Sequence, residues 1–535
     1  MTEMAFHHLI PVFSQKLLKT MTSQMKFTET VKNGYAFKGE RFQIGAGMLN
    51  EEVFRDAPVF LPLSTMNRHG LIAGATGTGK TKTLQVIAEG LSEAGVPVML
   101  MDIKGDLSGI AAAGEENEKL LERIQKMGIS WKPASFPADL LTLSGGEGVK
   151  LRATVSEFGP ILLSKILGLN DTQEGVVSML FKYCDDQKLP LLDLKDFVRI
   201  LQFAAQEGKP ELEKSYGRIS TTSTGTILRK VIELQQQGAD IFFGEASFEV
   251  EDLMRLAPDG KGMISILRVM DMQSKPKLFS TFMLSLLAEL YATLPEEGDL
   301  EKPKLVLFID EAHLVFQEAT KALLQQIETV VKLIRSKGVG IFFCTQNPQD
   351  IPAGVLAQLG LKVQHALRAF TAADRKVIKQ VAENYPETDF YETDVLITQL
   401  GIGEALITIL NEKGIPTPLV HTMLVPPRSR MNVLTMQETS QLNRISELAH
   451  KYETVKDTES AYEILNEKLD DAANRPNSEP EKKKRTVKEK STLEEVLDNS
   501  VTRQIGRTAA SVITRSLLGA LGLGGTTRRK RKSFF

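Results

Sequence analysis

The chain has little cysteine. Its 535 residues include two, Cys184 and Cys344, which lie far apart and have no partner in a CxxC pair. We therefore expect neither a disulfide framework nor a cysteine-based zinc site, and the composition fits a reducing cytosol. The chain also lacks an uninterrupted run of 18 apolar residues, so no transmembrane segment is expected. Because residues 5–25 have no continuous apolar core, we predict no signal peptide and a cytoplasmic location.

Acidic residues are missing from residues 501–535, a segment that carries eight basic ones: Arg503, Arg507, Arg515, Arg528, Arg529, Lys530, Arg531 and Lys532. The whole chain has a net charge of -2, so residues 1–500 hold 57 basic residues against 67 acidic ones. A basic tail of this kind can bind a polyanion, either nucleic acid or an anionic lipid surface. The alternative is a solvated, disordered tail that only aids solubility.

A glycine-rich stretch at residues 74–81 is the most specific motif in the chain. It follows an apolar run at 71–73 and leads into a helical pattern, which is the strand–loop–helix context of a P-loop. Backbone N–H groups of such a loop surround phosphate oxygens, and the helix N-terminus adds positive potential. We expect Lys80 to reach the β- and γ-phosphates and Thr81 to ligate Mg²⁺. The sequence thus predicts a site for ATP and Mg²⁺ formed by Gly74, Ala75, Thr76, Gly77, Thr78, Gly79, Lys80, Thr81 and Lys82.

An apolar stretch at residues 304–309 ends in two acids, Asp310 and Glu311, which is the Walker B arrangement. We expect Asp310 to hold the Mg²⁺ shell and Glu311 to polarise the attacking water as the general base. The next apolar strand ends at Thr345 and Gln346. A polar side chain there can sense the γ-phosphate. Gln346 is our first candidate for this role and Thr345 the second. A helix N-cap is the alternative interpretation.

Two further pairs of residues leave alternatives open. Asp102 or Asp106, after the second apolar strand, either faces the active site or only shapes a turn. Arg368 or Arg375 is a candidate arginine finger, which a neighbouring subunit supplies in ring-shaped ATPases, and a surface salt bridge is the alternative. The predicted catalytic residues are therefore Lys80, Glu311, Gln346, Arg368 and Arg375.

Buried strands that alternate with helices predict an α/β fold with a mostly parallel sheet. Composition and helix-breaking residues suggest how the chain is divided. We expect a short N-terminal segment (1–60), an ATPase core in two pieces (61–106 and 301–435), a mainly helical insertion (107–300), a helical extension (436–473), a charged linker (474–500) and the basic tail (501–535).

The motifs together resemble those of the HerA/FtsK superfamily of RecA-fold ATPases, and within it the bacterial YjgR group of HerA-like proteins. The resemblance rests on residues 67–81, 102–109, 310–313, 345–348 and 365–371 and covers roughly residues 40–435. It implies a RecA-like P-loop NTPase core, ATP hydrolysis and a homo-oligomeric ring, with a hexamer as the expected form. It also implies translocation on double-stranded DNA.

The chain departs from that family pattern in two places. The residues before the P-loop are too few for the N-terminal β-barrel of typical HerA proteins, and 230 residues separate Lys80 from Asp310. Both departures bear on how DNA would be engaged. We expect an ATPase that moves or remodels DNA, and two alternatives stay open. One is an ATP-dependent switch or scaffold for a protein or membrane partner. The other is a P-loop kinase, which the Asp-Glu pair disfavours because it favours water as the acceptor.

Overall fold

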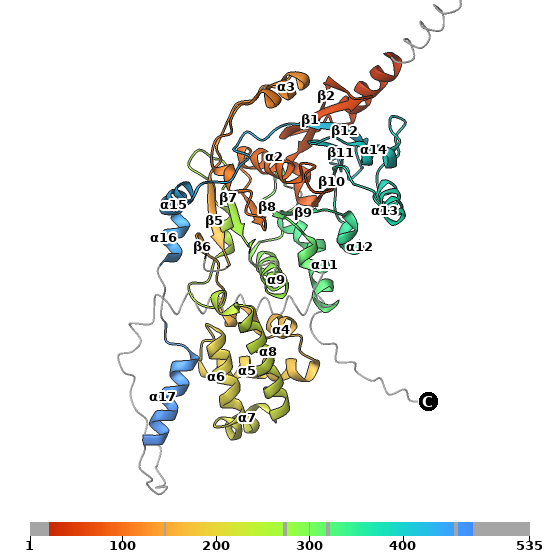
Figure 1. Cartoon of the computed structure of the whole chain (residues 1–535). Coiled ribbons are helices and arrows are strands. Elements are labelled where there is room, and N and C mark those ends of the chain that lie inside the picture. The colour runs from red at the N-terminus through yellow and green to blue at the C-terminus, as the bar shows by residue number, and fades with distance from the viewer. Residues whose placement is uncertain are drawn as a thin grey trace, which may run out of the picture.

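A 12-stranded sheet runs through the described part of the chain, in the order β2-β1-β12-β11-β10-β3-β9-β8-β4-β7-β5-β6 (Figure 1). The structure is a computed structural model that describes residues 21–143, 146–270, 275–298, 300–316, 321–453 and 458–474. The basic tail and nearly all of the expected linker lie outside these residues. No helix within them is long and apolar enough to cross a membrane.

From β10 to β6 the strands pair in parallel. Most of them are short apolar runs buried on both faces, as a parallel sheet requires. Their carboxyl ends meet at one edge of the sheet, where ligands of such sheets bind. This confirms the predicted α/β class with a mostly parallel sheet. The bounds are β3 Gly70–Ala73, β4 Val98–Asp102, β5 Ala138–Thr142, β6 Val149–Lys150, β7 Ile264–Arg268, β8 Leu305–Ile309, β9 Val339–Thr345 and β10 Leu361–Gln364.

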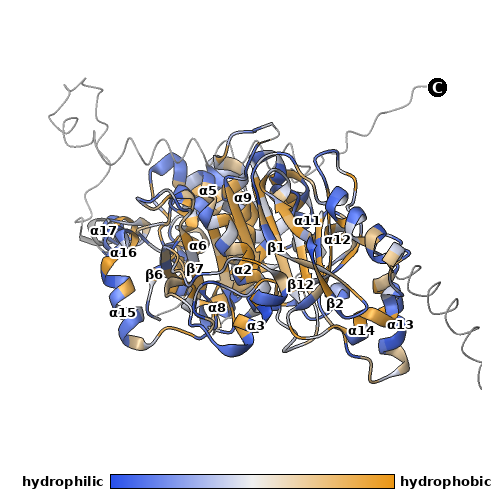
Figure 2. Ribbon diagram, turned by 90° about the horizontal axis from the view of Figure 1, so that it is seen from above, coloured by the Kyte–Doolittle hydropathy of each residue, from blue (hydrophilic) through white to orange (hydrophobic). Residues whose placement is uncertain are grey.

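Alternate residues of β4 pack into two different cores, because successive side chains of a strand point to opposite faces. Val98 and Leu100 face the core that contains α2 (Lys80–Glu93). Met99 and Met101 face the core that contains α9 (Pro276–Thr293) and α11 (Lys321–Ile334). Figure 2 shows the hydrophobic ribbon in the central strands and α9, with hydrophilic residues on the outer helices and loops. The sheet is therefore a middle layer with helices on both faces.

The edge of the sheet beyond β10 is antiparallel and includes residues from the N-terminal segment. It consists of β11 (Glu404–Ile409), β12 (Val420–Leu424), β1 (Arg41–Leu49) and β2 (Glu52–Pro62). The boundary expected at residue 60 thus needs correction, since residues 41–62 belong to the sheet. Polar and apolar residues are mixed in β2, and several of its residues are exposed, so this strand gives a weak sequence signal.

The stretch between the two Walker motifs contains both helices and strands. Its central part is a helical bundle, seen at the bottom of Figure 1, made of α4 (Val155–Leu167), α5 (Asp171–Gln187), α6 (Leu194–Ala205), α7 (Lys209–Tyr216) and α8 (Thr221–Gln236). Side-chain caps at Thr154, Asn170, Asp193 and Ser220 begin four of these helices. However, β5, β6 and β7 come from the same stretch and extend the sheet. Residues 107–300 are therefore not a purely separate insertion.

The expected helical extension consists of three helices. They are α15 (Met436–Ile445), α16 (Glu447–Glu453) and α17 (Ala461–Asn474). Ser446 separates the first two, since its hydroxyl accepts from the backbone N–H of Ala449 (3.2 Å) and donates to Asp139 of β5 (2.6 Å). α17 lies beside α6, where Asn466 accepts from Arg199 (2.8 Å). The extension thus contacts both the sheet and the helical bundle.

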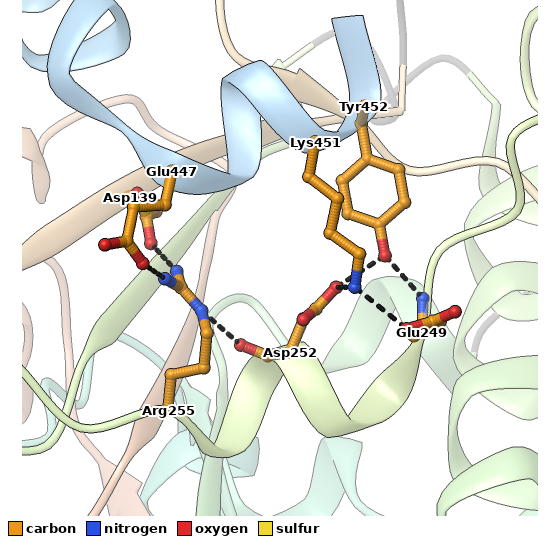
Figure 3. A network of polar contacts seen from close by, with 7 residues as sticks. All are labelled: Asp139, Glu249, Asp252, Arg255, Glu447, Lys451 and Tyr452. Carbon is orange, nitrogen blue, oxygen red and sulfur yellow. Dashed lines mark hydrogen bonds and ion pairs between the residues drawn. The ribbon is translucent and has the colours of Figure 1, made fainter. Parts of the chain in front are cut away.

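A network of polar contacts fastens α16 to the sheet (Figure 3). Arg255 forms ion pairs with the buried Asp139 and with Glu447 (3.3 Å). Nearby, Lys451 pairs with Glu249 (2.8 Å) and Asp252 (2.7 Å). Breaking a buried ion pair on one side leaves an uncompensated charge, whereas an exposed pair contributes little. The two halves of the network should therefore differ in their contribution to stability.

We predict that Arg255→Ala lowers the free energy of unfolding by about 2 kcal/mol, because Asp139 is buried and, among the described residues, would keep only its bond from Ser446. Lys451→Ala is the control in the same network, and its more exposed side chain should cost less than about 1 kcal/mol. Denaturant titration of both variants measures the difference. Equal losses would contradict this ranking.

Candidate active site

The glycine-rich loop lies between β3 and α2 and is fixed by backbone hydrogen bonds from three other segments. The Gly74 N–H donates to the carbonyl of Thr345 at the end of β9 (3.2 Å), and the Ala75 N–H donates to Ala366 after β10 (2.8 Å). The carbonyl of Thr78 accepts from Gly403 (3.0 Å). The loop's form is therefore set by the neighbouring strand ends and not by its own residues alone.

Gly74 has to be glycine because His365 lies directly against it. Its φ is +154°, and a Cβ atom there would lie 2.5 Å from the Cβ of His365. The imidazole is buried, and its Nε2 hydrogen-bonds with the Thr83 hydroxyl of α2 (2.9 Å). Burial lowers the pKa of His365 to about 4, so the ring is neutral at pH 7. His365 thus packs against the loop as a neutral side chain.

Lys80 bends back over the loop that precedes it. Its ammonium donates to the carbonyls of Gly74 (2.6 Å) and Ala75 (3.1 Å). Burial lowers the pKa of this lysine, and the nearby Glu311 and Asp310 carboxylates oppose that shift. In contrast, Lys82 points away, and its ammonium donates to the carbonyl of Met431 (2.6 Å). Of the two lysines, Lys80 is therefore the one placed to meet phosphate oxygens.

Asp310 directly follows β8 and is buried next to the loop. Its Oδ2 has no hydrogen-bond partner among the described residues, and burial raises the pKa of the carboxyl to about 6. A buried carboxylate oxygen without a hydrogen-bond partner fits a bound cation. The Asp310 carboxylate and the Thr81 hydroxyl at the start of α2 would hold Mg²⁺, which supplies positive charge to the β- and γ-phosphates when bound.

Glu311 has contacts on both carboxylate oxygens. Its Oε1 forms an ion pair with Lys104, and its Oε2 lies 3.5 Å from Gln346 Nε2 and 3.3 Å from His313 Nδ1. The charge of Lys104 keeps the pKa of Glu311 below its usual value despite burial, so the group is ionised at neutral pH. An ionised carboxylate is the form that a general base requires.

Thr345 and Gln346, the two candidates at the end of β9, have different hydrogen-bond partners. Thr345 donates to the carboxylate of Asp350 (2.7 Å), and Asn347 caps the short helical turn that follows. Gln346 instead reaches Glu311. The N-cap interpretation therefore applies to Asn347, and Gln346 is the residue that faces the acidic pair. Its role as a γ-phosphate sensor stays a prediction.

Asp102 and Asp106 have different surroundings. Asp102 accepts from the backbone N–H groups of Gly105 (2.7 Å), Asp106 (3.1 Å) and Leu107 (3.1 Å), so it shapes a turn. Asp106 has a buried Oδ1 without a hydrogen-bond partner among the described residues. Its charge acts to raise the pKa of both Lys82 and Asp310. The turn interpretation fits Asp102, while Asp106 faces the site.

Arg368 and Arg375 are both exposed. Arg368 donates to the carbonyl of Thr398 (3.4 Å), and Arg375 lies on α13 (Ala372–Ala382), which Thr371 caps. Arg375 lies one residue after Asp374, and its charge contributes to lowering the pKa of that carboxyl, so both the arginine-finger prediction and the salt-bridge alternative stay open. We predicted no role for Lys104 or His365 from the sequence, although they lie in the motif segments 102–109 and 365–371.

A family model described as "Helicase HerA-like C-terminal" matches residues 48–529. The chain belongs to this family. Relatives include "DNA double-strand break repair helicase HerA" from Sulfolobus acidocaldarius, which is 22% identical over 378 residues, covering 70% of this chain and 69% of that protein. The HerA of Saccharolobus solfataricus is 23% identical over 384 residues, covering 71% and 68%. "DNA import protein CedB" from Sulfolobus acidocaldarius is 23% identical over 375 residues, covering 70% and 55%.

Two solved structures share less sequence identity with the chain than these relatives do. The bacterial conjugative coupling protein TrwB has a TM-score of 0.49 and 14% identity, covering 76% of this chain and 95% of that one. VirB4 of Thermoanaerobacter pseudethanolicus has a TM-score of 0.45 and 16% identity, covering 71% and 96%. The family match itself confirms the HerA-like resemblance that the motifs suggested.

We predict that Gln346→Ala lowers kcat for ATP hydrolysis by about tenfold or more, because Gln346 contacts the expected base, and leaves ATP binding unchanged. Thr345→Val removes a hydrogen bond to Asp350 and should instead lower stability by about 1 kcal/mol. Steady-state kinetics and thermal unfolding of both variants separate these effects. A larger loss of kcat in the Thr345 variant would reverse the assignment.

Proposed function

We propose that this HerA-like chain is an ATPase that couples hydrolysis of ATP to movement or remodelling of double-stranded DNA, as a homo-oligomeric ring, with a hexamer as the expected form. The observation that carries the proposal is the meeting of Lys80, Asp310 and Glu311 at the carboxyl ends of β3 and β8. A lysine, a buried acid suited to Mg²⁺ and an ionised base in one place are the parts that phosphoryl transfer requires.

Water is the phosphoryl acceptor in this proposal. Glu311 is ionised and directly follows the acid proposed to hold Mg²⁺. The reaction is ATP plus water to ADP plus phosphate, with Glu311 taking the proton from the attacking water. This arrangement supports an ATPase over the alternative of a kinase.

Two observations support DNA as the partner. The names of the relatives refer to DNA repair and DNA import. In addition, residues 501–535 carry eight basic residues and no acidic ones, and such a charge pattern suits the phosphate backbone of nucleic acid. The same tail is compatible with an anionic lipid surface, so the experiment below includes that alternative.

The exposed arginines support assembly into a ring. Arg368 and Arg375 are both exposed, and both follow β10, beyond whose end the carbonyl of Ala366 holds the loop. We propose that one of them reaches the nucleotide of a neighbouring subunit, where an arginine stabilises charge in the transition state.

We predict that the purified protein hydrolyses ATP, that double-stranded DNA stimulates the rate, and that the stimulation weakens as salt rises because counterions are released on binding. Glu311→Gln should lower kcat by about 10²-fold or more while ATP still binds. Steady-state assays with and without DNA, at several salt concentrations, measure these effects. Anionic vesicles serve as the parallel arm.

The outcome decides between the proposed functions. Hydrolysis that requires Glu311 but ignores DNA would contradict the DNA motor and favour a switch or scaffold for a protein or membrane partner. Stimulation by vesicles in place of DNA would identify the membrane. Hydrolysis that persists in the Glu311→Gln variant would contradict the catalytic assignment itself.

We also predict that Arg368→Ala or Arg375→Ala lowers kcat by about 10²-fold or more without weakening ATP binding, because the acting arginine is needed only in the transition state. Mixing the inactive arginine variant with Glu311→Gln subunits should restore part of the activity, since each variant supplies the part that the other lacks. No recovery in mixed assemblies would contradict an arginine acting in trans.

A further inference from the structure

Glu311 is held by residues from the strands on both sides of β8. In the sheet, β8 lies between β4 and β9. Lys104, just beyond β4, forms an ion pair with Oε1, and Gln346, just beyond β9, approaches Oε2 at 3.5 Å. The carboxylate is thus fixed at both oxygens by two segments that are distant in sequence.

The backbone conformation of Glu311 is fixed, so the contacts of its side chain determine where the carboxylate lies. Its φ is +44°, an uncommon value for a residue other than glycine. Hydrogen bonds hold this conformation, since the Ala312 N–H donates to Cys344 (2.9 Å) and the Leu314 N–H donates to Glu311 (2.9 Å). With the backbone fixed, the place of the carboxylate depends on its contacts with Lys104 at Oε1 and with Gln346 and His313 at Oε2.

The turn that carries Lys104 is itself fixed. Asp102 accepts three backbone N–H bonds across residues 105–107. Gly105 has a φ of +77°, and a Cβ atom there would lie 2.5 Å from the sulfur of Met270. Lys104 is therefore presented from a preformed turn, and its side chain is about one third exposed while that of Glu311 is 6% exposed.

We propose that Lys104 is a positioning residue for hydrolysis, whose ammonium fixes the Glu311 carboxylate at the phosphate end of the P-loop and does not itself bind the nucleotide. The inference rests on the proposed ATPase activity. Lys80 contacts the loop carbonyls, whereas Lys104 contacts Glu311, so the two lysines have separate tasks. A fixed base raises the rate of the chemical step because little reorientation is needed when the reaction occurs.

Three variants test the assignment. Lys104→Met keeps the length of the side chain but removes the charge, Lys104→Arg keeps a charged donor for the carboxylate, and Lys119→Met is the control on the exposed surface of α3 (Glu118–Met127). For each, kcat is measured at saturating ATP, and the Kd of a fluorescent ATP analogue is measured at equilibrium. The retained binding also shows that the variant is folded.

We expect Lys104→Met to lower kcat by about tenfold or more while Kd stays within about twofold, and Lys104→Arg to recover much of the rate. Adding Lys104→Met to Glu311→Gln should lower kcat little further, because Lys104 acts through Glu311. Full additivity in that double variant would overturn the proposal.

Three other results would also overturn it. They are an unchanged kcat in Lys104→Met, a higher kcat that shows a restraining role, and a rise in Kd that shows direct contact with the nucleotide. A wild-type protein without ATPase activity would overturn the proposed function and this inference together. An active wild type with an unaffected Lys104→Met variant would overturn the inference alone.

Discussion

The site depends on the way the P-loop is hydrogen-bonded between the ends of β9 and β10. The backbone N–H groups of Gly74 and Ala75 donate to the carbonyls of Thr345 and Ala366. The backbone N–H of His365 donates in turn to the carbonyl of Ala73 (2.7 Å). These bonds need parallel strands on both sides of β3, so the order of the sheet determines the form of the loop. Because the loop is held by its neighbours, we expect it to need little rearrangement when phosphates bind.

Charge is the second constraint at this edge of the sheet. Lys80 and Lys104 lie among Asp106, Asp310 and Glu311. Burial raises the pKa of Asp310, whereas the charge of Lys104 outweighs burial at Glu311. Glu311 has a lysine partner and a lowered pKa, whereas Oδ2 of Asp310 has no hydrogen-bond partner among the described residues and the pKa of that carboxyl is raised. This difference is the basis for our proposal that Glu311 acts as the base and Asp310 holds the cation.

The sequence predicted the parts of the fold that have strong local signals. The P-loop, Asp310 with Glu311, and the strand ending at Thr345 all have their expected places, because each joins a buried apolar strand to a polar turn. It did not predict that β5 and β7 extend the sheet, since five-residue strands within a helical region carry little periodicity. Pairings across the sheet, such as Lys104 with Glu311, depend on strand order, which single-sequence patterns do not show.

We propose that the ends of β3 and β8 form a site in which Glu311 faces the γ-phosphate of ATP. The most direct test is an experimental structure with Mg²⁺ and a non-hydrolysable ATP analogue. We predict that the phosphates lie in the P-loop against Lys80, that Thr81 and Asp310 are at the metal, and that the Glu311 carboxylate faces the γ-phosphate with Lys104 still beside it. A nucleotide bound elsewhere, or Glu311 turned away from the phosphate, would contradict the account.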